Sequence, residues 1–325
     1  MNFKSHFKIY IEKLISQKIS LGYKYEASKR ILQRFDHFCL EEYPEETNLT
    51  KELIDAWAMR NPMESVATRK GRITPVNHLA ILMANLDFES VTFPMHSLPS
   101  KEVYHPYIFS NEELKNFFNR TDKCHIRPES PYRHLFMPIF FRLIYSCGLR
   151  VSEARHLKLK DVDLNHNVLT IVSAKNNKDR LVPISSKMNQ RCASYFNLVH
   201  LMSSGEDYFF PNIDGNPMTL TNAYKNFRKF LWQAGISHGG RGKGPRIHDL
   251  RHTFAVNRLK NWITEGKDLH TLLPVLQAYL GHESYYETAY YLRLTADMFP
   301  FIVVKSHEKF GNLIPILEEA TDESN

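Results

Sequence analysis

Long apolar runs are absent from this sequence of 325 residues. The most apolar stretch, residues 135–145, is much shorter than the roughly 20 residues of a membrane-spanning helix, and Arg142 interrupts it. Lys4, Lys8 and Lys13 lie among the first apolar residues, whereas an export signal carries its positive charges ahead of an apolar block. We therefore expect a globular protein that stays in the cytoplasm.

Cysteine is scarce as well. The four cysteines show no CxxC pair or other metal-ligand spacing and are few for a disulfide scaffold: Cys39, Cys124, Cys147 and Cys192. We expect reduced, mostly buried thiols. With 43% hydrophobic and 12% aromatic residues the chain can bury cores, and its length predicts two domains.

Positive charge is in excess and unevenly placed. The chain has 42 Lys and Arg against 35 Asp and Glu, a formal net charge of +7. Residues 1–100 hold 13 basic and 12 acidic side chains, residues 101–310 hold 29 and 19, and the last fifteen residues hold four acids and no base. A basic body favours a polyanion partner, because Lys and Arg release counterions when they neutralise phosphates. Many soluble proteins of this charge bind no nucleic acid, so charge alone leaves the partner open.

The first part of the sequence has the apolar period of short helices. Apolar side chains recur three or four residues apart in segments 3–14, 31–38, 51–59 and 66–86. Thr50 can cap the third helix, and Pro75 must either kink the fourth or mark its true start. We assign this predicted four-helix bundle to residues 1–90.

A second domain follows an aperiodic connector, residues 91–107, which contains three prolines. Helical signals resume where Ser110 and Glu113 fit a capping box. Two β-rich runs, VLTIV and RLVPI, then flank a polar connection and predict a hairpin. Helical spacing returns in segments 222–234, 248–261, 272–280 and 287–293. The expected fold is mainly α with a small antiparallel β-sheet, and the second domain spans 108–298.

The segment YSCGLRVSEARHLKL places Arg150 at the start of a helix, just after the turn at Gly148. An arginine there can aim its planar fork at a phosphate together with free backbone N–H groups. The alternative is a surface ion pair between Arg150 and Glu153, one turn along the helix.

The segment RIHDLRHTFAVNRL places His248, Arg251 and His252 on one face of a helix, where all three can donate to an oxyanion. A zinc helix of HExxH type competes, but Asp249 replaces the glutamate and Arg251 would repel a cation. The other alternative is a pair of core or capping histidines.

The segment YLGHESYYETAYYLRL ends a helix at His282 and then carries clustered tyrosines, which usually pack in a core. The stretch HGGRGKGPR has no Ser or Thr after Lys243 and no preceding strand, so we exclude a nucleotide-binding P-loop there.

Together, these residues and a lysine in the hairpin resemble the tyrosine recombinase, or phage integrase, family of site-specific DNA recombinases. Four motifs carry the resemblance in the family's order: GLRVSEA, AKNNKDRLVPI, HDLRHTFA, and LGH followed nine residues later by Tyr291. They span essentially the whole second domain. The resemblance implies a catalytic domain of tyrosine recombinase type and, at 1–90, a SAM-like core-binding domain that binds the opposite face of the duplex.

The resemblance also implies a role for each matching residue. Arg150 and Arg251 match the arginines that hold the non-bridging oxygens of the scissile phosphate, and Glu153 matches the acidic residue that braces the site. Tyr291 matches the nucleophile. Tyr290 is the backup nucleophile, about 100° further round a helix.

Lys175 matches the hairpin lysine, which would protonate the leaving 5′ oxygen. His248 matches the histidine that is a candidate base, and His282 matches one that donates a hydrogen bond to the developing oxyanion. Ala174 and Asn176 replace the usual glycines around the lysine, so the hairpin tip is expected to be stiffer.

The implied function is site-specific recombination: cleavage and rejoining of DNA through a 3′-phosphotyrosyl intermediate, without metal or ATP. The implied partners are double-stranded DNA with specific core sites and further copies of the chain, which is expected to be a homotetramer on DNA and a monomer free in solution. The enzyme would serve a mobile element, transposon or phage, or act as Xer recombinases do. The alternatives are a type IB topoisomerase-like nicking and resealing enzyme and a catalytically silent DNA-binding regulator.

The last segment, residues 299–325, has an apolar part followed by the acidic end EEATDESN. In the family, a terminal helix of this kind docks into the neighbouring protomer. Here it either docks in that way or packs on its own domain.

Overall fold

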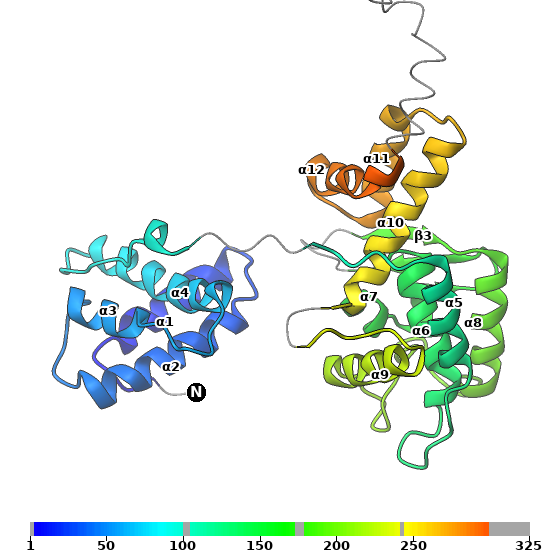
Figure 1. Ribbon diagram of the computed structural model, residues 1–325. Coiled ribbons are helices and arrows are strands. Elements are labelled where there is room, and N and C mark those ends of the chain that lie inside the picture. Colours follow the sequence, from blue (N-terminus) through cyan, green and yellow to red (C-terminus); the bar gives the residue numbers. More distant parts are fainter. Residues whose placement is uncertain (1–2, 100–104, 173–178, 241–243, 299–325) are drawn as a thin grey trace, which may run out of the picture. The chain divides into compact units, whose positions relative to one another are not determined.

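The structure is a computed structural model that describes residues 3–99, 105–172, 179–240 and 244–298 (Figure 1). The chain divides into two compact units, Met1–Tyr104 and His105–Asn325. Lys175 and the predicted tail at 299–325 lie outside the described residues. Within the described ranges, no helix is long and apolar enough to cross a membrane.

Four helices with the predicted apolar positions build the first unit. Their bounds are Lys8–Ser20 (α1), Glu26–Glu42 (α2), Lys51–Ala58 (α3) and Val66–Ala84 (α4). The side chain of Thr50 accepts a hydrogen bond from the third backbone N–H of α3, so the predicted cap is confirmed. Pro75 lies buried inside α4 and does not mark its start, because Ser65 caps the helix ten residues earlier.

The connector is more ordered than its prolines predict. A 3₁₀ turn, Met95–Ser97 (η1), follows Phe93, and Leu98 packs with Phe93 against residues of the first unit. The side chain of Asn77 donates to the carbonyl of Phe93 and accepts from its N–H, both at 2.9 Å. Residues 91–98 therefore belong to the first unit, because their apolar side chains have an apolar surface to cover.

The second unit contains eight helices and one sheet among its described residues (Figure 1). The helices are Asn111–Asp122 (α5), Arg133–Ser146 (α6), Val151–Arg155 (α7), Ser186–Val199 (α8), Leu220–Gln233 (α9), Ile247–Thr264 (α10), Leu269–Leu280 (α11) and Tyr285–Ala289 (α12). The antiparallel strands are Val162–Asp163 (β1), Val168–Ile171 (β2) and Arg180–Pro183 (β3), in the order β1-β2-β3. Two 3₁₀ segments are Leu159–Asp161 (η2) and Tyr290–Met298 (η4).

The most apolar stretch of the sequence becomes the central helix, α6. Phe140, Phe141 and Ile144 are fully buried there, and α6 contacts α5, α8 and α10. Because α6 is buried on most of its surface, the helix that carries the HDLRHTFA motif, α10, is held against a rigid core.

Two details differ from the sequence prediction. Strand β1 was not expected, because its two residues are too few to show a period. The helix predicted over 287–293 is instead the end of α12 followed by the 3₁₀ segment η4. Over so few residues, an apolar pattern cannot separate a period of 3.6 from one of 3.0, and helix ends often tighten in this way.

Gly148 is required by its conformation and its surroundings. Its φ is +59°, and a Cβ atom built on it would lie 2.7 Å from Leu280 Cδ2 and 2.8 Å from Phe254 Cδ1. The absence of a side chain thus lets the turn before Arg150 lie against α10 and α11.

We expect Gly148→Ala to lower the free energy of unfolding of the second unit by about 1–3 kcal/mol more than Gly215→Ala does, because overpacking adds to the backbone strain. Gly215 is the matched control: its φ is +76°, and nothing lies within 4 Å of its added Cβ. Urea unfolding of both variants measures the difference. Equal losses would show that a methyl group fits at residue 148.

Candidate active site

The last turn of α11 holds three arginine side chains from three different elements. Successive carbonyl oxygens accept one hydrogen bond each: Tyr279 O from Arg180 Nε at 2.9 Å, Leu280 O from Arg251 Nη2 at 2.8 Å, and Gly281 O from Arg150 Nη2 at 2.8 Å. A helix C-terminus offers unpaired carbonyls and a partial negative charge, so it attracts cations. The guanidinium groups of Arg150 and Arg251 therefore meet on adjacent peptide units.

Arg150 stands at the N-cap of α7 and is paired with Glu153. Its Nη1 donates to Glu153 Oε1, and its backbone N–H donates to Glu153 Oε2, both at 2.8 Å. The two side chains are 18% and 5% exposed. The ion pair that the sequence allowed thus forms, but it is buried in the site and not a feature of the surface.

Arg251, on α10, is 1% exposed. Its Nη1 donates to Gly148 O at 2.6 Å, so the guanidinium bridges the turn before α7 and the end of α11. Burial, and next the charge of Arg150, lower the pKa of Arg251 to about 10, so the group stays charged at neutral pH. The two arginines are close enough to repel, which makes their common position a site for an anion.

Arg180, at the start of β3, was not among the predicted site residues. Its two terminal nitrogens donate to the two oxygens of Glu153 at 3.0 and 2.8 Å, a paired fork geometry. Burial alone would raise the pKa of Glu153, but the hydrogen bonds from Arg180 and Arg150 lower it to about 2. Glu153 is therefore an anion that ties the hairpin strand to Arg150.

Tyr291, in η4, lies against α10 and is 2% exposed. Its hydroxyl oxygen is 3.0 Å from Nδ1 of His252, and its ring stacks on His282 with centroids 5.9 Å apart. Burial raises the pKa of Tyr291, while the nearby charges of Arg251 and Arg150 oppose that rise. The phenol is therefore in the electrostatic field of both arginines.

The two predicted site histidines, His248 and His282, both lie in this cluster. His248 lies one turn before His252 on α10, with ring centroids 4.5 Å apart. Burial, and then the charges of Arg251 and Arg150, lower the pKa of His248 to about 4. Burial and the charge of Arg251 do the same for His282, whose Nδ1 lies 2.8 Å from Thr288 Oγ1. Both imidazoles are thus neutral at pH 7.

The structure brings together six of the seven predicted site residues: Arg150, Glu153, His248, Arg251, His282 and Tyr291. The seventh, Lys175, lies outside the described residues. The described strands that flank it, β2 and β3, pair in register, with Ile171 opposite Arg180. Two neighbouring arginines with a buried tyrosine beside them are an arrangement suited to phosphoryl transfer.

Comparison with known proteins identifies the family of the chain. The model of the phage integrase family matches residues 109–298. A putative integrase/recombinase of Sinorhizobium fredii, y4rB, is 30% identical over 307 residues, which cover 89% of this chain and 93% of that protein. The chain belongs to the phage integrase family.

Solved structures of other recombinases share the fold. XerH site-specific recombinase bound to a palindromic difH substrate superimposes with a TM-score of 0.61 at 20% identity, covering 87% of this chain and 79% of that one. The integrase of transposon Tn1549, in complex with a circular intermediate DNA, also has a TM-score of 0.61, at 15% identity, covering 87% and 94%. At these identities the likeness concerns the fold.

Two contacts in the site of this recombinase were not predicted from the sequence. His252 was expected to share a helix face with His248 and Arg251 and to be able to donate to an oxyanion, but its contact with Tyr291 depends on where η4 packs. Arg180 directly precedes the Leu-Val-Pro of β3. The sequence signal that could have indicated its role is a charged residue at the start of a short strand.

A zinc ion on the helix face of His248 and His252 would meet a fixed positive charge. Arg251, a cation, lies on the same face of α10 as His248 and His252, and its charge lowers the pKa of both. In the described part of the chain, no group of three or more His, Cys, Asp or Glu side chains could hold a metal ion.

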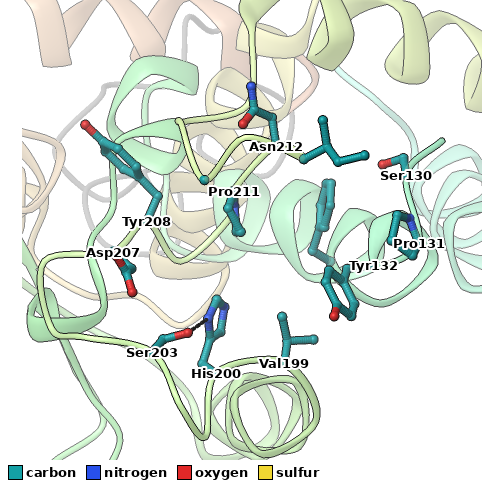
Figure 2. Close-up of a pocket in the computed structure, with 13 residues that line it drawn as sticks. Ser130, Pro131, Tyr132, Val199, His200, Ser203, Asp207, Tyr208, Pro211 and Asn212 are labelled. Atoms are coloured by element: carbon teal, nitrogen blue, oxygen red, sulfur yellow. Dashed lines mark hydrogen bonds between the residues drawn. The ribbon is translucent and has the colours of Figure 1, made fainter.

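A pocket of the recombinase at the other end of α6 is separate from this site (Figure 2). It has a volume of about 310 Å³, and Tyr132, His200 and Tyr208 are among its lining residues. Nδ1 of His200 lies 3.3 Å from Ser203 Oγ, and Nε2 lies 3.1 Å from Phe209 O. Both ring nitrogens are thus used within the fold, and the pocket does not contain a predicted catalytic residue.

The buried histidines should make the stability of the recombinase depend on pH. Their folded-state pKa values are about 4 for His248, 3 for His252 and 4 for His282, all below the ordinary value near 6.5. Between pH 6.5 and 4 the unfolded chain therefore binds protons that the folded chain does not, so stability is full above pH 6.5 and is lost as the pH falls. Glu153 contributes a separate loss only at lower pH, because its pKa moves from about 4.3 to about 2.

We expect the melting temperature of the second unit to fall steadily from pH 7 to pH 4.5, and to fall less in His248→Gln. Differential scanning calorimetry across this range measures both curves. His270→Gln, at an exposed position of α11, is the matched control. Identical pH slopes for His248→Gln and the unmodified chain would contradict the prediction.

Proposed function

We propose that this recombinase cleaves and rejoins double-stranded DNA at specific core sites by transferring one strand to Tyr291. The observation that carries the proposal is the convergence of Arg150 and Arg251 on adjacent carbonyls beside the Tyr291 hydroxyl. The complexes of XerH and of the Tn1549 integrase with DNA add support through their common fold with this chain.

In this mechanism, the two arginines hold the non-bridging oxygens of the scissile phosphate. Attack of the phenolic oxygen builds negative charge on those oxygens, and fixed cations in a buried site lower the energy of that transition state. Because Arg150 is held by Glu153 and Gly281, and Arg251 by Gly148 and Leu280, little reorganisation is needed when the phosphate binds.

The remaining groups move protons. Lys175 protonates the leaving 5′ oxygen, a transfer that is worth roughly 10²- to 10⁴-fold in rate when the acid is well placed. His282 donates a hydrogen bond to the phosphoryl oxygen, and His248 is the first candidate to accept the phenolic proton. The product is a 3′-phosphotyrosyl link with a free 5′ hydroxyl. Since the covalent link keeps the energy of the phosphodiester bond, resealing requires neither ATP nor a metal ion.

Recombination further requires that a strand from a second duplex attack this link. Several protomers must then act on the same DNA, so we propose a homotetramer on DNA that forms from monomers in the bacterial cytosol or nucleoid. The biological setting is a mobile element or Xer-like resolution of chromosomes.

The test uses the DNA that flanks the gene of this recombinase. The purified full-length protein is incubated with nicked duplexes that trap the covalent intermediate, and the attached residue and cleaved bond are mapped by mass spectrometry and sequencing. The proposal expects one tyrosine-linked adduct at defined positions, unchanged by a chelator. Relaxation of any supercoiled plasmid without a preferred site would indicate a type IB topoisomerase, and binding without an adduct would indicate a regulator.

A further inference from the structure

The histidine that contacts the Tyr291 hydroxyl is His252, one turn along α10 from the histidine matched by the family motif. Its Nδ1 lies 3.0 Å from the phenolic oxygen, a normal hydrogen-bond length. His248 contacts His252 ring to ring, with an interplanar angle of 88°. In the described part of the chain, His252 is thus the imidazole within reach of the reacting oxygen.

The neighbouring groups favour one direction for this hydrogen bond. Burial, then the charges of His248 and Arg251, lower the pKa of His252 to about 3, so its ring is neutral at pH 7. The guanidinium of Arg251 also acts on the phenolic oxygen, and a guanidinium can only donate. The oxygen accepts from Arg251, and we assign its own proton to the hydrogen bond with Nδ1, which places the ring proton of His252 on Nε2.

We propose that His252 is the catalytic base that takes the phenolic proton of Tyr291 during DNA cleavage. This inference rests on the proposed function and replaces His248 in the role of base. When the phenolic oxygen forms its bond to phosphorus, its O–H bond breaks and the proton moves to Nδ1, which leaves an imidazolium. The bond from phosphorus to the 5′ oxygen breaks, and the 5′ oxygen receives its proton from Lys175. In the resealing step, the imidazolium returns its proton to the departing phenolic oxygen.

The groups around His252 make its basicity respond to the substrate. On its own helix it faces His248 and Arg251, while His282 and Tyr291 face it from the loop after α11 and from η4. A phosphodiester held by Arg150 and Arg251 brings a negative charge that offsets these cations. The proton affinity of the imidazole then rises when DNA is bound, which is when a base is needed.

The first experiment replaces His252 by asparagine, whose side chain can occupy the place of Nδ1 without taking up a proton. His252→Asn should cleave a cognate duplex roughly 10²- to 10⁴-fold more slowly in single turnover, with DNA binding retained in gel-shift assays. His252→Gln is made in parallel, so that a folded variant is available for the measurement. A rate within a few-fold of the unmodified protein in a folded variant would overturn the inference.

A second experiment separates a base from a residue that only positions the phenol. Trifluorotyrosine, which ionises near neutral pH, is incorporated at residue 291 of the unmodified chain, of His252→Asn and of His248→Asn. If His252 is the base, the analogue restores most of the rate to His252→Asn and little to His248→Asn. A reversed pattern, or no restoration in either variant, would overturn the inference.

A third measurement tests whether His252 acts on the leaving group instead of on the phenol. When sulfur replaces the bridging 5′ oxygen of the substrate, the leaving group needs no proton. We therefore expect Lys175→Ala to regain cleavage activity on this substrate and His252→Asn to remain slow. Rescue of His252→Asn by this substrate would contradict the base role. If the unmodified protein forms no adduct on any of these DNAs, the proposed function itself fails, and this outcome is distinct from all the others.

Discussion

Replacing Tyr291 by phenylalanine should abolish the covalent protein–DNA adduct and leave DNA binding intact. The substitution removes only the hydroxyl, so the ring keeps its stacking on His282 and its buried position, since Tyr291 is 2% exposed. The lost hydrogen bond to His252 should cost about 1 kcal/mol of unfolding free energy or less, because such bonds exchange with water. Trapping on nicked duplexes and denaturing gels measures the adduct, and gel shifts measure binding.

Tyr290→Phe is the matched control for this prediction. Tyr290 is the preceding residue, and its ring centroid is 6.2 Å from that of Tyr291. Successive side chains of a 3₁₀ segment point in directions about 120° apart, so the two hydroxyls cannot reach the phosphate from the same backbone position. Tyr290→Phe should therefore keep normal cleavage. An adduct that persists in Tyr291→Phe and disappears in Tyr290→Phe would show that Tyr290, and not Tyr291, is the nucleophile.

Replacing Arg251 by lysine should have the second largest effect, on both cleavage and stability. The guanidinium donates to Gly148 O and Leu280 O from two different nitrogens, and a single ammonium on a flexible stem cannot reproduce that fork. We expect the cleavage rate to fall about 10²- to 10³-fold, as when one donor to a developing oxyanion is removed. Leaving a buried acceptor without its donor should lower the free energy of unfolding by about 1–3 kcal/mol.

Single-turnover cleavage and urea unfolding measure these two effects separately. Arg258→Lys is the matched control, because Arg258 is an exposed arginine on the same helix, with its guanidinium 5.8 Å from the Phe254 ring centroid. We expect it to change neither quantity by more than a small amount. If Arg251→Lys cleaved at the normal rate, the proposed contact with the phosphate would be wrong, whatever the change in stability.

Much of the fold was predictable because its local signals are strong. The caps at Thr50 and Ser110 placed helix starts correctly, and the β-rich runs predicted β2 and β3. What failed depended on tertiary contacts. The connector became part of the first unit through Asn77 and Leu98, and the chain after Ala289 tightened into η4.

In the candidate site, too, the residues of the motifs were predictable and the contacts made by packing were not. Motif order predicted the arginines, the histidines and Tyr291, since each of these roles requires one particular side chain. The pairing of Arg180 with Glu153 and the contact of His252 with Tyr291 arise from packing, which spacing along the chain does not encode. The role of Lys175 stays a prediction, because that residue is outside the described part of the structure.

The acceptors that hold Arg180, Arg251 and Arg150 are main-chain oxygens of three consecutive residues. A substitution at residue 279 or 280 changes the side chain but leaves these main-chain acceptors in the chain. The three hydrogen bonds depend instead on the path of the backbone. A one-residue insertion or a proline in this turn would misalign all three guanidinium groups at once and inactivate the enzyme, although every motif residue would still be present in its sequence.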